Sequence, residues 1–104
     1  MFYILENGEP KKVNDISEWS RWFDDLSKRV IKQTLVSVAG KTVEISTIFT
    51  GTHMYPSKPL MLWETMIFGG KYDLWREKYS SEEEALLKHE DLCVMVLKNE
   101  ELEL

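Results

Sequence analysis

The chain has 104 residues, of which 43% are hydrophobic and 30% charged, so it has the size and composition of one globular domain spanning residues 1–104. The single cysteine, Cys93, excludes an intrachain disulfide and a cysteine-based zinc site. The net charge of -5 argues against direct DNA binding, because a phosphate backbone needs a clustered basic face.

The first elements are a strand and a helix. Residues 2–5 are apolar and end at Asn7-Gly8, a turn dipeptide that tolerates positive φ, and residues 11–13 could return beside them. A helix is predicted over residues 15–29, because Asp15 and Glu18 have the spacing of a capping box. Its apolar stripe, at three- and four-residue steps, consists of Ile16, Trp19, Trp22, Phe23 and Leu26.

Three strands follow. Residues 33–38 and 42–50 are rich in β-branched residues and flank a turn at 39–41. The second strand alternates, so Val43, Ile45, Thr47 and Phe49 share one face and Glu44, Ser46, Ile48 and Thr50 the other. A loop at 51–59 leads to a strand at 60–68 that is apolar on both sides and therefore predicted to be covered on both faces. Its exception is Glu64, on the predicted face of Leu62, Met66 and Phe68.

The chain closes with a short strand and a helix. Residues 74–79 form the strand, and Ser80 and Glu83 have the capping-box spacing at the start of the helix. The acidic tail at 99–104 is expected to fray. The order β-α-β-β-β-β-α predicts an α+β domain in which two amphipathic helices pack on a mainly antiparallel sheet of about 4–5 strands.

Few residues suggest chemistry. His53 lies in the loop between the two best strands, where it could contact a ligand or simply be exposed. Glu64 must face water or be paired, since an unpaired buried carboxylate is costly. Its candidate partners are Arg76 or Lys78 on the next strand or Thr47 across the sheet, and a ligand contact is the alternative.

Other candidates have a structural explanation. His89 and Cys93 lie on the apolar stripe of the last helix, and packing explains them better than a nucleophile-base pair. Trp75 could belong to the core or stack on a ligand. The two histidines lack metal-binding spacing, and no catalytic motif is present, so we expect no enzyme activity, no metal and no cofactor.

One part of the chain resembles a known family. Residues 46–51 read STIFTG, His53 follows, residues 59–70 read PLMLWETMIFGG, and residues 79–85 read YSSEEEA ahead of His89. This pattern resembles an uncharacterised family of small bacteriophage and prophage proteins, in which the corresponding segments read much like STVFLG, PLLFETMVFGG and RYSTWEEA. The chain departs from it at Trp63, usually Phe, at Lys78, usually Arg, and in a loop without the glycines often found around the histidine.

The resemblance implies a phage accessory protein that acts by binding in the cytoplasm of the bacterial host. We expect it to counter host antiviral defence by sequestering a nucleotide-derived signal. The predicted ligand-binding residues are Thr47, His53, Glu64 and Trp75, with Arg76 or Lys78 for a phosphate. The alternatives are a protein–protein inhibitor of a host defence or nucleic-acid-binding protein, and a minor virion or assembly component.

Two further expectations concern the surroundings of the protein. No apolar run approaches the roughly 20 residues of a membrane span, so no membrane association is expected. A homo-oligomer is expected, because a small domain often completes its pocket with a neighbouring copy.

Overall fold

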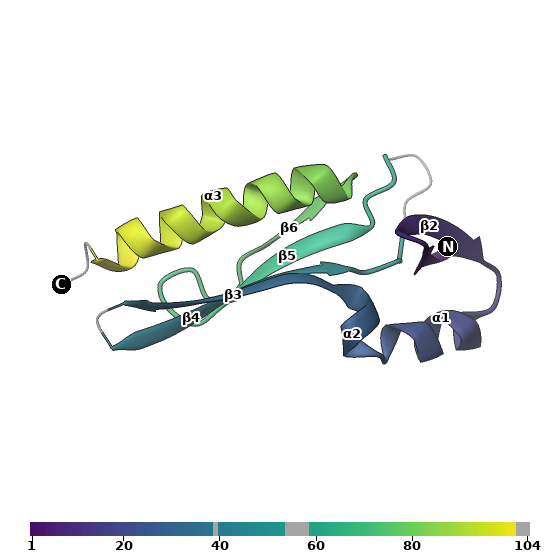
Figure 1. Cartoon of the computed structure of the whole chain (residues 1–104), viewed down its shortest axis with the longest axis horizontal. Helices are drawn as coiled ribbons and strands as arrows, with labels where there is room; N and C mark the ends of the chain where they lie inside the picture. Colours follow the sequence, from purple (N-terminus) through teal and green to yellow (C-terminus); the bar gives the residue numbers. More distant parts are fainter. Residues whose placement is uncertain (39, 54–58, 102–104) are drawn as a thin grey trace.

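The computed structural model describes residues 1–38, 40–53 and 59–101 (Figure 1). In chain order its elements are β1 (Phe2–Glu6), β2 (Glu9–Val13), α1 (Ile16–Phe23), α2 (Leu26–Arg29), β3 (Val30–Val38), β4 (Lys41–Phe49), β5 (Trp63–Phe68), β6 (Arg76–Tyr79) and α3 (Glu82–Glu101). The predicted α+β class is confirmed, with antiparallel strands and helices packed on the sheet.

The N-terminal hairpin is a sheet of its own. β1 pairs with β2 from Phe2 opposite Val13 to Glu6 opposite Glu9. The turn adopts positive φ at Asn7 (52°) and Gly8 (80°), as the Asn-Gly pair predicts. The hairpin therefore adds a two-stranded unit beside the main sheet, which has four strands.

The single helix predicted at 15–29 is wrong, because the chain breaks into α1 and α2. Asp15 caps α1 by accepting a hydrogen bond from the Ser17 amide at 2.8 Å. Asp25 repeats the arrangement for α2 and accepts from the Ser27 amide at 3.0 Å. A second N-cap inside the apolar stripe thus ends one helix and starts another.

The main sheet has the strand order β3-β4-β5-β6 and is antiparallel throughout. α3 runs along one of its faces (Figure 1). The core has two clusters of buried residues, one at each end of the sheet. The cluster nearer α1 contains Trp22, Phe49, Leu62, Trp63, Tyr79 and Ala85. The other contains Val43, Ile45, Ile67, Leu92 and Val96.

Several predicted boundaries shift. The strand predicted at 60–68 begins at Trp63, so Leu62 lies before it, buried in the core rather than beside Glu64. The strand predicted at 74–79 begins at Arg76, because Leu74 adopts a positive φ of 69° in the preceding turn. Of the acidic tail at 99–104, residues 99–101 belong to α3, and residues 102–104 lie outside the described residues.

The prediction that residues 60–68 are covered on both faces is wrong. In β5 the side chains of Trp63, Thr65 and Ile67 are buried on the α3 side. On the other side Glu64 and Met66 are half-buried and Phe68 is 38% exposed. One long helix covers one face of a four-stranded sheet, and the opposite face stays open. None of the helices in the described residues is long and apolar enough to span a membrane.

Candidate functional site

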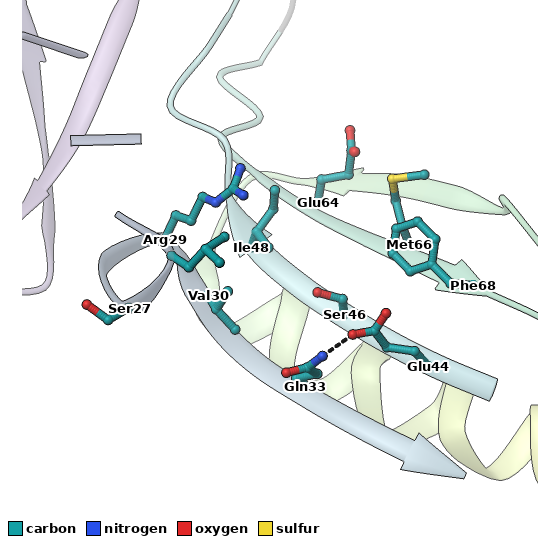
Figure 2. Close-up of a pocket in the computed structure, with 11 residues that line it drawn as sticks. Ser27, Arg29, Val30, Gln33, Glu44, Ser46, Ile48, Glu64, Met66 and Phe68 are labelled. Atoms are coloured by element: carbon teal, nitrogen blue, oxygen red, sulfur yellow. Dashed lines mark hydrogen bonds between the residues drawn. The ribbon is translucent and has the colours of Figure 1, made fainter. Parts of the chain in front are cut away.

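A groove of about 550 Å³ lies on the open face of the sheet (Figure 2). Its floor is formed by β3, β4 and β5, and α2 closes one end. The lining residues are Leu26, Ser27, Arg29, Val30, Gln33, Glu44, Ser46, Ile48, Glu64, Met66 and Phe68. The volume falls within the range of roughly 300–1,000 Å³ that small-molecule sites occupy.

Arg29 stands at the α2 end of the groove, held by a column of aromatic rings. Phe2 packs on Trp19 with centroids 5.2 Å apart, and Trp19 stacks on Phe23 at 4.8 Å. The Arg29 guanidinium lies over the Phe23 ring, 4.3 Å from its centroid. Its Nε atom is buried without a hydrogen-bond partner in the described part of the chain. The column fixes the position of this planar cation at the end of the groove.

Glu64 supplies an acceptor in the middle of the groove. It extends from β5 on the open face, and within the described residues no hydrogen bond or ion pair engages its carboxylate. Glu44, one strand away, accepts a hydrogen bond from the Gln33 amide (Figure 2). The groove therefore carries one engaged carboxylate and one that is open to a ligand.

The two ends of the groove differ in chemistry. Figure 2 shows Arg29 beside Ile48 at one end and Phe68 with Met66 at the other. A guanidinium binds phosphate or carboxylate groups in a fork, whereas an aromatic ring and a thioether offer a surface for a flat, apolar group. Glu64 between them can accept from hydroxyl or amino groups. The site can thus bind an elongated ligand with an anionic end and a planar end.

Three of the residues predicted to bind ligand share this face. Directly opposed residues in an antiparallel pair point to the same side, and Lys78 is opposite Glu64 while Arg76 is opposite Met66. Both cations are exposed on β6, next to the groove rather than in its lining. Glu64, Arg76 and Lys78 are therefore brought together.

The other three predicted residues lie elsewhere. Thr47 is fully buried beneath α3, on the opposite face from Glu64. Trp75 is half-buried and packs against the core cluster that contains Ile67. His53 is 9% exposed and lies beside the N-terminus, where its amide donates to the Met1 carbonyl at 3.2 Å. The six residues consequently do not form one pocket.

A chain of polar groups runs through the core under α3. The His89 ring is fully buried, with Nε2 2.8 Å from the Thr34 hydroxyl and Nδ1 2.7 Å from the Thr47 hydroxyl. Thr47 in turn lies 2.5 Å from the Thr65 hydroxyl. Burial, reinforced by the nearby Lys32, lowers the pKa of His89 from its ordinary 6.5.

The surroundings of His89 and Cys93 explain why these two residues do not act as a nucleophile-base pair. Both nitrogens of the His89 ring are occupied by threonine hydroxyls. Burial raises the pKa of the Cys93 thiol, which favours the unreactive protonated form. His89 and Cys93 therefore have a structural role here.

Within the described ranges no cluster of three or more histidine, cysteine, aspartate or glutamate side chains could hold a metal ion. No family model, curated protein or solved structure matches this chain. The site's chemistry therefore rests on the residues themselves.

Sequence reasoning missed much of the groove. The alternation of residues 42–50 assigned Glu44, Ser46 and Ile48 to one face, and these residues do line it. The alternation alone does not indicate a groove, because the neighbouring strand at 60–68 is predicted to be covered on both faces. Arg29 was missed because it was assigned to the end of one long helix, whereas it is the last residue of α2, directly before β3.

Proposed function

We propose that the protein is a non-enzymatic binder of a nucleotide-like small molecule, and that the groove on the open sheet face is its binding site. The observation that carries the proposal is the convergence in one concavity of apolar walls, a guanidinium fixed over an aromatic ring, and a carboxylate without a partner among the described residues. In a phage-type protein such binding would sequester a nucleotide-derived signal in the host cytoplasm.

The proposed pose follows the polarity of the groove. A phosphate lies at Arg29, at the α2 end of the groove. A ribose or base donates hydrogen bonds to Glu64. The base rests against Met66 and Phe68 at the far end. Arg76 and Lys78, on the adjacent strand, add positive potential for a second phosphate.

The test is thermal unfolding against nucleotides, cyclic dinucleotides and cyclic ADP-ribose isomers. A ligand present at about 100 times its dissociation constant stabilises the fold by about 2.7 kcal/mol. For a domain of this size that raises the melting temperature by roughly 10 °C or more. No shift with any compound in the panel would overturn the proposal.

Glu64→Gln is the diagnostic variant. Glu64 is partly exposed and has no partner in the described part of the chain, so the substitution leaves the melting temperature of the free protein nearly unchanged. The loss of a charge-assisted hydrogen bond weakens binding by about 10- to 100-fold. Glu9→Gln, an exposed carboxylate on the N-terminal hairpin, is the matched control and retains full affinity. Equal affinity in both variants would exclude Glu64 from the site.

A protein partner is the second candidate. Leu26, at one end of the groove, is 58% exposed, and Phe68 is exposed at the other end, so an apolar segment of a host protein could lie along the same floor. In that case the protein would act as an inhibitor that occludes its partner. This alternative replaces the nucleotide proposal if no small molecule shifts the melting temperature.

A further inference from the structure

The two edges of the main sheet are protected to different degrees. β6 is an edge of four residues, three of them charged: Arg76, Glu77 and Lys78. Short, charged edges resist pairing with other chains. β3, the other edge, has nine residues, no proline, and Lys32 as its single charged residue. Lys32 is itself engaged with Glu90 of α3.

Within residues 1–38, 40–53 and 59–101, no strand pairs with the outer side of β3. Along residues 31–38 the backbone hydrogen bonds found in the described part of the chain are those to β4. In an antiparallel pair alternate residues direct their N–H and C=O groups away from the partner strand. A row of such groups about 30 Å long, at about 3.4 Å per residue, is a template for another strand.

The flank of α3 beside β3 is apolar. Glu90 contacts Lys32, which shows which side of the helix faces this edge. At about 100° per residue, Leu86, Cys93 and Leu97 lie on the same side as Glu90. Leu97 is 42% exposed, and the other two are half-buried. An apolar strip thus accompanies the open edge on the helix side.

On the open face of the sheet the same edge presents one large apolar side chain, Leu35, between the polar Gln33 and Ser37. Leu35 lies near the middle of β3, opposite Glu44 in the register, and is 65% exposed. Both layers of the domain therefore present apolar side chains next to unpaired backbone.

We propose that a second copy of this chain occupies the β3 edge. The two β3 strands pair antiparallel about a two-fold axis at Leu35 and join the sheets into one of eight strands. Leu35 then contacts Leu35 of the partner subunit, and Thr34 faces Val36 of the partner subunit. The two α3 helices run antiparallel on the same face of the joined sheet.

A second copy fits better than an unrelated partner because the edge is self-complementary. The surface at this edge, counting both the strand layer and the helix layer, is about 30 Å long and about 20 Å deep, which gives about 600 Å² per copy. Two copies bury about 1,200 Å², the lower limit for stable interfaces. The interface does not involve the groove-lining Glu64 or Arg29, so it stands whether or not the groove binds a nucleotide.

The test is the mass of the full chain in solution by sedimentation equilibrium. Wild type should have twice the chain mass of 12.3 kDa. Leu35→Lys should be monomeric, because the axis then brings two ammonium groups together, while the new side chain faces Glu44 within its own chain and leaves the fold intact. Leu87→Lys is the matched control: Leu87 is also 65% exposed but lies on the side of α3 away from the sheet, so this variant stays dimeric.

A wild type that stays monomeric at every concentration overturns the proposal. A Leu35→Lys variant that remains dimeric, or a Leu87→Lys variant that dissociates, overturns the assignment to β3.

Discussion

The buried ring of His89 makes the stability of the fold depend on pH. Its pKa in the folded state is below the ordinary 6.5, because burial and Lys32 both disfavour the charged ring. The unfolded chain therefore binds the proton more tightly than the folded chain does. The contribution of the neutral ring is complete above about pH 6.5 and is lost as the pH falls below that value, by at most about 1.4 kcal/mol per pH unit.

The assay is urea unfolding of wild type and His89→Leu at about pH 7.5 and about pH 5.5. At the higher pH the variant is less stable by about 1–3 kcal/mol, because the hydroxyls of Thr34 and Thr47 each lose a partner. Between the two pH values wild type loses more stability than the variant does, by at most about 1.4 kcal/mol. The other titrating groups are common to both proteins and cancel in the difference. If the two proteins lose equal stability, the assignment of this pH dependence to His89 is refuted.

Two core positions give further predictions, each read out by thermal or urea unfolding with its control. Gly51→Ala lowers the free energy of unfolding by at least about 3 kcal/mol, because φ of Gly51 is +68° and an added Cβ would lie 2.1 Å from the Tyr3 carbonyl oxygen. Gly8→Ala is the control: φ is +80° there but no atom is near, so the loss is only about 1–2 kcal/mol. Equal losses would contradict the close approach at Gly51. Ile45→Ala lowers the free energy of unfolding by about 2–5 kcal/mol, because Ile45 is fully buried. Leu87→Ala, at an exposed position, lowers it by less than about 1 kcal/mol. An equally small loss for Ile45→Ala would contradict the assigned core.

Local patterns were sufficient to predict most elements of the fold. The Asn7-Gly8 turn and the alternation of β4 each depend on neighbours in the sequence, and both appear in the structure. The division of the first predicted helix into two depends on Asp25, which caps α2. The apolar stripe continues past this residue and favours a single helix, so the stripe alone does not reveal the break. The late start of β6 depended on the positive φ of Leu74, a conformation that leucine seldom adopts and that composition does not reveal.

The candidate site was harder to predict because it depends on what covers the sheet. Glu64 was identified from one charge within an apolar strand, and it lines the groove. Thr47 and Glu64 were grouped although their strands direct them to opposite faces. Since Ile48 is opposite Glu64 and Thr47 is opposite Thr65, the register separates them, and register is a tertiary property. Arg29 depends on the stacked rings of Trp19 and Phe23, a contact that spans α1 and α2.

The central claim is that ligand binds on the open face of the sheet, and methyl NMR tests it most directly. In a titration with the panel compound that raises the melting temperature most, the methyl groups of Ile48 and Met66 report on the groove, whereas those of Ile45 and Ile67 report on the face beneath α3. The account predicts shifts at Ile48 and Met66 that saturate with ligand, with Ile45 and Ile67 nearly unchanged. Shifts concentrated at Ile45 and Ile67, or no saturable shift at any of the four, would contradict it.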